Sequence, residues 1–236
     1  MKDIILTHDE IVTRKENPVN KNFKGAYGAC SYYENGLIKI FYTDIKDRIL
    51  KNIEANLKRS SNIIMYPKAK VLEKDINKLC GYYMDIAPGK TLLRLRNEML
   101  CGKSDMSFEY FLYLYYDKFL PELKNEEVLI SDMKSCQIYI DDNIYLTDTD
   151  TFLDKQSNDT KIWLRLMKYN NVLNGNLNEI NKVFYETFNF NGRVYIWMDD
   201  YDLGNVNYMY KFIDEIKSKT NQNIKTFKEF FSIGSD

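Results

Sequence analysis

The chain has 236 residues, with 33 Lys and Arg against 34 Asp and Glu and a formal net charge of -1. Because the positive and negative charges nearly cancel, the protein has no overall field that would attract nucleic acid or an anionic membrane. Hydrophobic residues make up 44% of the sequence, which indicates a globular protein and excludes intrinsic disorder. The length fits one large domain or two closely packed lobes.

The cysteines and the N-terminus give expectations about the cell compartment. Cys30, Cys80, Cys101 and Cys136 are dispersed, with no CxxC pair, and the sequence holds one histidine. This pattern predicts reduced, mostly buried thiols rather than a zinc site or a disulfide framework. The first apolar run, residues 4–6, is too short for a signal peptide, and no stretch approaches the roughly eighteen apolar residues of a membrane helix. We therefore expect a cytoplasmic protein without membrane insertion or nucleic-acid binding.

The first third of the chain predicts a sheet with one helix. Residues 23–42 hold β-branched and aromatic residues on both sides of an Asn-Gly step, which predicts a β-hairpin. Residues 44–60 predict an amphipathic helix, with Asp44 as its cap. The apolar stripe of this helix is formed by residues spaced four apart: Ile45, Ile49, Ile53 and Leu57. Residues 71–77 and 78–86 are two further predicted strands, and Pro88 with Gly89 closes the sheet-rich part.

The rest of the chain is predicted to be mainly helical. Helical patterns occupy residues 91–100, 108–123, 160–173, 177–188 and 207–219. The exception is a small hairpin predicted for residues 136–140 and 143–147. The tyrosine-rich segment within 108–123 is expected to be a buried helix. The sequence thus predicts an α+β fold, with a small sheet-rich lobe over residues 1–84 and a larger helical lobe over residues 85–236.

Acidic residues gather around the small hairpin. Asp132, Lys134 and Gln137 precede it, and Asp148 follows eleven residues after Gln137. This order resembles the protein-kinase-like superfamily, whose catalytic loop reads Asp-x-Lys-x-x-Asn and is followed by a metal-binding Asp. The resemblance implies a bilobal fold and an ATP- and Mg²⁺-dependent phosphotransferase. Its acceptor would be a hydroxyl group on a protein or a small molecule.

The resemblance also implies a role for each of these residues. Asp132 would accept or orient the proton of the attacking hydroxyl, and Lys134 would neutralise the transferring phosphoryl group. Gln137 and Asp148 would hold Mg²⁺. Asp150 is expected to be either a second metal ligand or an acid that supports the first one.

Upstream segments extend the resemblance toward the nucleotide. The segment FKGAYGAC resembles a glycine-rich phosphate-binding loop, in which Gly25 and Gly28 match two glycines and Tyr27 the aromatic residue between them. Lys39, in the next strand, matches the lysine that contacts the α- and β-phosphates. Glu54, on the predicted helix, is its expected ion-pair partner.

The segment GYYMDIAPGKTL resembles the hinge between the two lobes of this superfamily, where a nucleotide would be held. Met84 would occupy the gatekeeping position, and the backbone of Asp85 to Ala87 would face the adenine. The resemblance covers roughly residues 22 to 152, and it fades beyond Phe152.

Several positions depart from the family pattern. Gln137 replaces the usual Asn, and Asp148, Thr149 and Asp150 replace Asp-Phe-Gly. These departures leave open a pseudokinase that acts as a protein-interaction module. A third reading takes Asp148 to Asp150 as the Asp-x-Asp metal motif of some glycosyltransferases, which would need a doubly wound domain ahead of the motif.

Overall fold

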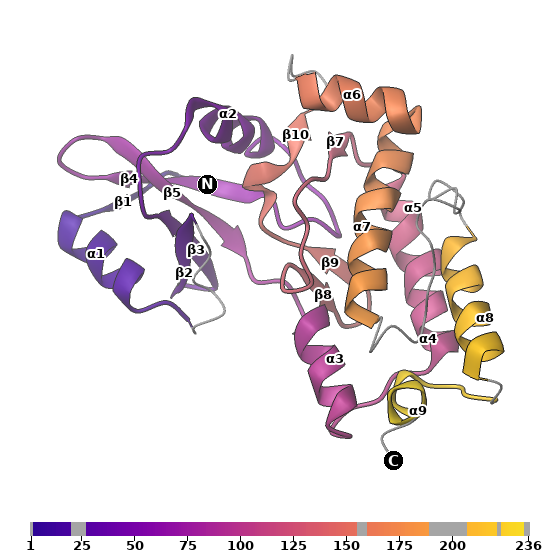
Figure 1. Ribbon diagram of the computed structural model, residues 1–236. Coiled ribbons are helices and arrows are strands. Elements are labelled where there is room, and N and C mark those ends of the chain that lie inside the picture. Colours follow the sequence, from indigo (N-terminus) through magenta and orange to yellow (C-terminus); the bar gives the residue numbers. More distant parts are fainter. Residues whose placement is uncertain (1, 20–26, 155–159, 189–206, 221–222, 234–236) are drawn as a thin grey trace. The chain divides into compact units, whose positions relative to one another are not determined.

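The computed structural model describes residues 2–19, 27–154, 160–188, 207–220 and 223–233. It is an α+β protein whose chain divides into two compact units (Figure 1). The first unit comprises Met1–Ala87 together with Thr147–Thr151, and the second comprises Pro88–Leu146 and Phe152–Asp236. The sequence places a single boundary between residues 84 and 85. The structure divides after Ala87 and adds the later segment Thr147–Thr151 to the first unit.

The first unit is built on one five-stranded sheet with the strand order β1-β4-β5-β3-β2. β1 runs parallel to β4, and the other pairs are antiparallel. Its elements are β1 Ile4–Leu6, α1 His8–Glu16, β2 Gly28–Tyr33, β3 Gly36–Phe41, α2 Asp47–Asn56, β4 Pro67–Glu73, β5 Lys78–Asp85 and the 3-10 turn η3 Thr149–Thr151. The predicted hairpin and the strand predicted for residues 78–86 are confirmed. The strand predicted for residues 71–77 lies four residues earlier, at β4, and residues 74–77 form the turn that follows it. A doubly wound domain, which the glycosyltransferase reading requires, is not what precedes the Asp-x-Asp motif.

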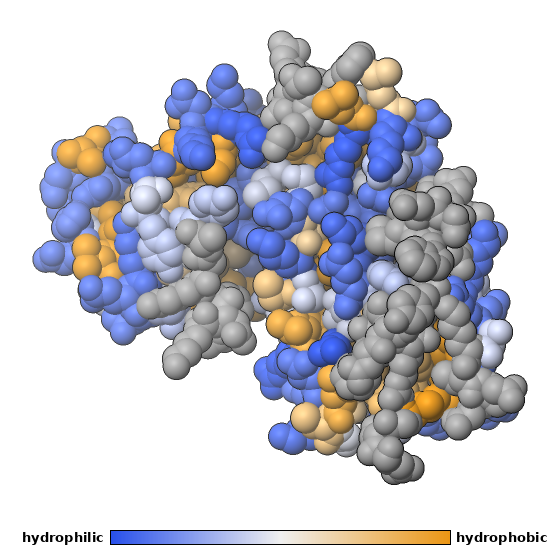
Figure 2. Space-filling model, viewed as in Figure 1, coloured by the Kyte–Doolittle hydropathy of each residue, from blue (hydrophilic) through white to orange (hydrophobic). Residues whose placement is uncertain are grey.

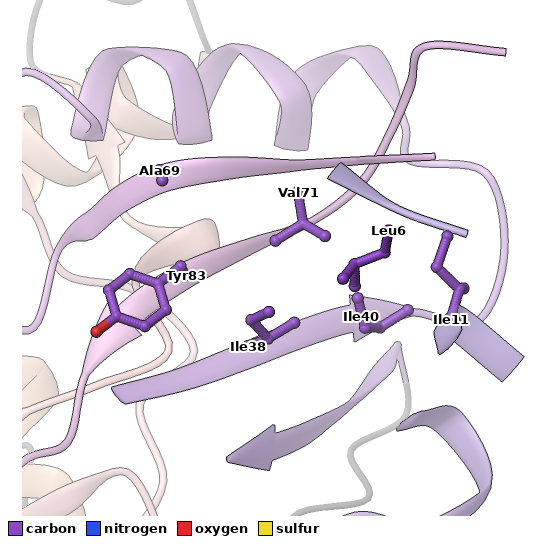
Figure 3. Packing of buried hydrophobic residues seen from close by; sticks show 7 residues of the cluster. All are labelled: Leu6, Ile11, Ile38, Ile40, Ala69, Val71 and Tyr83. Atoms are coloured by element: carbon purple, nitrogen blue, oxygen red, sulfur yellow. The ribbon is translucent and has the colours of Figure 1, made fainter. Parts of the chain in front are cut away.

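The two faces of this sheet carry different side chains because residues alternate along each strand. Ile38 and Ile40 of β3 point to one face, where they pack with residues from β1, α1, β4 and β5 (Figure 3). Leu37 and Phe41 pack on the other face with Ile53 of α2. Lys39 lies between Ile38 and Ile40 in sequence, so its side chain projects to the α2 face.

Helix α2 forms from the predicted apolar stripe but is shorter than expected. Ile53 is fully buried, and the other three members of the stripe are partly buried against the same cluster. The helix begins after Lys46, which provides no side-chain cap. The predicted cap at Asp44 is wrong, because that carboxylate forms an ion pair with Lys78 of β5.

The second unit is mainly helical and contains two small antiparallel sheets, β6-β8-β9 and β7-β10. Its helical elements are α3 Leu92–Leu100, α4 Phe108–Tyr113, the π-helical turn η2 Leu114–Phe119, α5 Leu120–Leu123, α6 Thr160–Tyr169, α7 Val172–Phe188, α8 Tyr208–Thr220 and α9 Phe227–Ser232. Its strands are β6 Lys90–Thr91, β7 Val128–Leu129, β8 Ile138–Ile140, β9 Ile144–Leu146 and β10 Leu153–Asp154. The predicted small hairpin is confirmed as β8 and β9.

An aromatic core holds the second unit together. Phe111 of α4 packs edge-to-face against Phe184 and Phe188 of α7 and Phe227 of α9, with ring centroids 5.2–5.6 Å apart. Such pairs add stabilisation beyond the area that they bury. The prediction of a buried helix for the tyrosine-rich segment is therefore confirmed in part: Tyr115 is buried, but Tyr110 and Tyr113 are exposed.

On the face shown in Figure 2, hydrophilic residues cover most of the surface that is not grey, and hydrophobic residues form separate patches. Within the described part of the chain, no helix combines the length and the apolar character needed to cross a membrane. All four cysteines are described, and none forms a disulfide. The expectation of mostly buried thiols is met only in part: Cys30 and Cys80 are partly buried against the apolar clusters of the sheet, Cys136 is partly buried, and Cys101 is exposed.

Candidate functional site

The centre of the candidate site is the ammonium group of Lys39, which lies on the α2 face of the first unit's sheet. Its Nζ donates to Asp148 Oδ1 and to both carboxylate oxygens of Asp150, the latter at 3.0 and 3.2 Å. A lysine ammonium has three protons to donate, and these three oxygens accept them. The structure thus brings together three of the predicted site residues, although Lys39 and Asp148 are 109 positions apart in the sequence.

Burial and charge act in opposite directions on these groups. Burial of Lys39 acts to lower its pKa, but Asp148 and Asp150 outweigh burial, so the pKa of Lys39 is raised. Burial raises the pKa of Asp150 to about 7; Lys39 opposes this shift, and the charge of Asp148 adds to it. Burial also raises the pKa of Tyr82, whose hydroxyl lies 3.5 Å from Asp150 Oδ1.

Helix α2 supports the turn that carries Asp150. The side-chain amide of Asn52 donates to the backbone oxygen of Asp150 at 3.2 Å, and that of Asn56 donates to the backbone oxygen of Thr149 at 2.9 Å. Residues four apart lie on one face of a helix, so both amides point to the same turn. Both asparagines are buried. Sequence reasoning missed them, although two asparagines spaced four apart beside the apolar stripe were a usable signal.

The expected ion pair between Lys39 and Glu54 is wrong. The Glu54 carboxylate instead accepts a hydrogen bond from Lys70 of β4 at 2.6 Å. Lys39 and Lys70 are both in register with Tyr82 on β5, one on each side, which places them two strands or about 10 Å apart. Glu54 also follows Asn52 by two residues, so it points about 200° around the helix from the asparagine face.

The backbone is unusual at two predicted functional residues. Asp132 has a φ of 56° and Asp148 a φ of 66°, in the left-handed region that costs free energy for residues other than glycine. The other three such residues in the described part of the chain lie in hairpin turns or directly after a helix: Glu34, Asn77 and Asn170. Asp132 and Asp148 have neither explanation. Strain of this kind concentrates at functional sites.

The predicted catalytic loop lies in the second unit. Asp132 and Lys134 are more than half exposed, with Lys134 Nζ 3.6 Å from Asp132 Oδ2. Gln137 accepts a hydrogen bond from the backbone N–H of Lys134 through its Oε1 at 2.7 Å, and its own N–H donates to the Lys134 carbonyl at 2.9 Å. Gln137 therefore closes the loop between these two positions.

Two helices hold this loop in place on either side of Asp132. Arg165 of α6 donates to the Ile130 carbonyl at 2.8 Å, and Glu179 of α7 accepts from the Met133 N–H at 3.1 Å. Arg165 and Glu179 also form an ion pair with each other. The loop backbone is thus fixed by side chains two residues before Asp132 and one residue after it.

Asn176 of α7 adds a third connection. Its amide donates to the Val128 carbonyl at 3.0 Å and accepts from the Ile130 N–H at 2.8 Å. The asparagine is completely buried, so these bonds satisfy both its polar atoms and the loop backbone. Sequence reasoning missed Arg165, Asn176 and Glu179. Polar residues beside apolar neighbours on α7 were the available signal, as in the segment NLNEIN.

The predicted phosphate-loop residues are only partly described. Gly25 lies outside the described residues. Tyr27 is exposed, and its backbone oxygen accepts from the Tyr42 N–H at 3.0 Å. Gly28 is the first residue of β2, where an added Cβ would lie 2.5 Å from the Ile40 carbonyl oxygen. Close strand pairing is therefore sufficient to explain Gly28.

The predicted adenine-binding residues lie at the end of β5 and just after it. Met84 is buried in the cluster between sheet and α2. Asp85 forms an ion pair with Lys68 and pairs with Gly36 across the sheet. Ala87 is buried at the end of the first unit's main segment.

A separate cavity of about 610 Å³ lies in the first unit between α1 and β2. Its lining includes Asp9, Arg14 and Ser31, and none of the predicted site residues. Arg14 is already engaged there, since it donates to Ser31 Oγ at 3.0 Å and to the Tyr32 carbonyl at 2.8 Å. The cavity does not belong to the site around Lys39.

The arrangement therefore consists of two groups, one in each unit. Lys39, Asp148 and Asp150 meet in the first, and Asp132, Lys134 and Gln137 share one loop in the second. Within the described ranges, no group of three or more His, Cys, Asp or Glu side chains is placed to bind a metal ion. Comparison of the chain with protein-family models finds no match, and comparison with curated proteins finds none either.

Proposed function

We propose that the protein is an ATP- and Mg²⁺-dependent phosphotransferase of the protein-kinase-like superfamily, acting on a hydroxyl group of a protein or small molecule. One observation carries the proposal: Lys39 and Asp148, far apart in the sequence, meet on the α2 face of the sheet. In this chemistry a strand lysine contacts the α- and β-phosphates, and an aspartate holds the metal ion that bridges the β- and γ-phosphates. The lysine and the aspartate must then lie side by side.

The residues present fit a magnesium ion. Asp148 is the accessible member of the buried group, with 29% of its side chain exposed against 3% for Asp150. Magnesium typically takes one or two protein carboxylates and completes its shell with water and phosphate oxygens. Asp148 would supply the carboxylate, and Gln137 is the second ligand that the family resemblance implies. The ion would neutralise charge that develops on the transferring phosphoryl group.

The second group of residues fits the acceptor side of the reaction. Asp132 is exposed and lies on a strained backbone that Arg165, Asn176 and Glu179 hold in place. An exposed carboxylate in a fixed position can accept or orient a hydroxyl proton. Lys134, close to Asp132, would offset negative charge on the phosphoryl group.

The fold agrees with this proposal in its order of elements. A hairpin with Lys39, a helix and two strands form the first unit, and a catalytic loop, a small hairpin and helices follow in the second. Asp148 comes directly after that small hairpin, as the metal-binding aspartate does in the superfamily. We assign the bilobal protein-kinase-like architecture on this basis, as part of the proposal.

A nucleotide-binding module without catalysis is the second candidate. It is favoured by Gln137, whose amide oxygen is already used by the Lys134 N–H. A glutamine that serves mainly to close the loop would coordinate the metal weakly. Such a protein would bind nucleotide through Lys39 and Asp148, and it would act through contacts with a partner protein.

The test combines nucleotide binding with turnover. We expect millimolar Mg²⁺ and ATP to raise the melting temperature of the wild-type protein, because a ligand that binds the native state stabilises it. Asp148→Asn should abolish formation of ADP. Asparagine is chosen because it tolerates a positive φ and keeps the shape of the side chain. Asp214→Ala, at an exposed position on α8, is the control and should leave ADP formation unchanged.

Each result decides between the candidates. Absence of a thermal shift in the wild-type protein contradicts nucleotide binding and both candidates with it. A shift without ADP formation favours the binding module. Full turnover in Asp148→Asn would remove Asp148 from the mechanism.

A further inference from the structure

The two carboxylates that contact Lys39 differ in accessibility. Asp150 makes two contacts with the ammonium group, and its side chain is 3% exposed. Asp148 accepts from the ammonium group through Oδ1, and its side chain is 29% exposed. A ligand that arrives from solvent can therefore reach Asp148, whereas Asp150 is enclosed.

Asp150 is also held by contacts other than those with Lys39. Asn52 of α2 holds its backbone oxygen, and Asn56 holds the preceding backbone oxygen of Thr149. The hydroxyl of Tyr82 lies 3.5 Å from the Asp150 carboxylate. Helix α2 is thus linked to Lys39 through the turn Thr149–Thr151, and not through a carboxylate on the helix itself.

We infer that Asp150 is the residue that positions Lys39, in place of a glutamate on helix α2. Glu54 cannot take this role, because it is held by Lys70 on the opposite side of Tyr82. The part of the inference that concerns nucleotide rests on the proposed function. A phosphate that contacts Lys39 from the accessible side, where Asp148 lies, would leave both contacts to Asp150 in place. The lysine would then keep its position with and without ligand.

The experiment compares matched deletions of the two acidic side chains, Asp150→Ala and Glu54→Ala. The first measurement uses the protein without nucleotide or metal and follows the ¹⁵N–¹H NMR signal of the Lys39 ammonium, identified by its loss in Lys39→Arg. The group is buried and hydrogen-bonded, so its protons should exchange slowly enough to be seen. We expect Asp150→Ala to shift or abolish this signal and Glu54→Ala to leave it unchanged.

The second measurement is the dissociation constant of Mg²⁺ with a non-hydrolysable ATP analogue, by calorimetry. We expect Asp150→Ala to weaken binding at least tenfold, through loss of a positioned lysine, and Glu54→Ala to change it less than twofold. If Asp150→Ala does not fold, Asp150→Asn and Glu54→Gln replace the pair, since both keep the shape of the side chain and remove its charge.

The outcomes separate this inference from the proposed function. An unchanged Lys39 signal in the Asp150 variant, or an equal change in the Glu54 variant, overturns the inference whatever the nucleotide result. Wild-type protein that binds no nucleotide contradicts the proposed function, and the NMR comparison alone then decides on Asp150. Nucleotide binding that is equally strong in the Asp150 variant would overturn the role of Asp150 in binding.

Discussion

Burying the ammonium group of Lys39 costs free energy, which its carboxylate partners must offset. Three charged groups in one buried place cannot all keep their ordinary affinity for protons. The pKa of Lys39 is raised, because its two partners outweigh the effect of burial, and the pKa of Asp150 is raised mainly by burial. Part of the free-energy cost of burying these charges therefore falls on the ionised form of Asp150.

This cost predicts a pH dependence of stability for the protein in EDTA, without nucleotide. The pKa of Asp150 is about 7 in the folded state against 3.8 for its ordinary value, so between these limits the folded state binds one proton more than the unfolded state. Its contribution to stability must then fall as the pH rises from about 4 to about 7. The Asp150→Asn variant cannot ionise at this position. Its free energy of unfolding should therefore fall by ~1–4 kcal/mol less than that of the wild-type protein over this range.

Urea unfolding at pH 5 and at pH 8 measures the effect as a difference between the two proteins. Taking the difference removes the contribution of the other carboxylates, which are common to both. Equal changes in the free energy of unfolding would show that Asp150 is ionised throughout. A larger loss in the Asp150→Asn variant would mean that the sign is opposite, with a carboxylate stabilised by Lys39.

At the scale of elements, periodicity predicts what a helix buries but not which residue it presents to a site. Ile49 and Ile53 place α2 correctly against the sheet, and Ile45 packs against the same cluster from the segment before the helix. The same pattern says little about the polar residues between them. Glu54 is the more attractive charged partner for Lys39, and the structure presents the uncharged Asn52 and Asn56 to the turn instead. The choice depends on a rotation of the helix that apolar spacing does not fix closely enough.

Two helices that sequence reasoning missed have signals that it could have used. α1 and α9 each begin with a capping box, Thr7 with Glu10 and Thr226 with Glu229. This motif satisfies backbone N–H groups at a helix start and is readable from the pattern Thr-x-x-Glu. Both helices are short, so the apolar periodicity on which the prediction relied is weak within them.

The helices α6 and α7 give the second prediction, because they fix the loop that carries Asp132. Single replacement of Arg165 or Glu179 by Ala should destabilise the protein, and the double replacement should cost less than the sum. We expect a coupling energy of ~1–3 kcal/mol, since the pair is mostly buried and both members also bind the loop backbone.

A matched control for this pair lies on α7, the helix that carries Glu179. Lys182 and Glu186 of α7 are 3.8 Å apart and at least half exposed. Exposed pairs of this kind contribute little, so their coupling should be close to zero. Urea unfolding of the two sets of variants gives both energies. Equal coupling in the two pairs would show that Arg165 and Glu179 form only an ordinary surface ion pair.

For the molecule as a whole, sequence reasoning predicts the order of elements better than the assembly of the site. The strands, the small hairpin and most helices of the second unit follow from local patterns, which act over a few residues. Only the family resemblance assigned Lys39 and Asp148 to one nucleotide site, because nothing local joins positions 109 residues apart, and their direct contact was not predicted. That Thr147–Thr151 joins the first unit depends on long-range packing and was not foreseen.

Because Thr147–Thr151 belongs to the first unit, the behaviour of a fragment that lacks this segment can be predicted. A fragment of residues 1–87 contains the sheet and α2 but lacks Thr147–Thr151. Lys39 would then lie beside the apolar residues of the α2 face without either carboxylate, which is unfavourable for a charged group. Replacing it by methionine, of similar length and uncharged, should therefore stabilise the fragment. In the whole chain the same change leaves the carboxylate of Asp150 buried without its cation, so at pH 8 it should be destabilising.

Circular dichroism during titration with trimethylamine N-oxide compares the stability of the wild-type and Lys39→Met fragments. The comparison works even if both are unfolded in buffer, because this osmolyte favours compact states. The Lys39→Met fragment should fold at the lower concentration, and urea should unfold the full-length Lys39→Met protein before the wild type. The opposite sign is expected because Thr147–Thr151, present only in the whole chain, supplies both carboxylate partners of Lys39. The same sign in both contexts would mean that Lys39 does not depend on Asp148 and Asp150, and that the buried triad contributes little to the first unit.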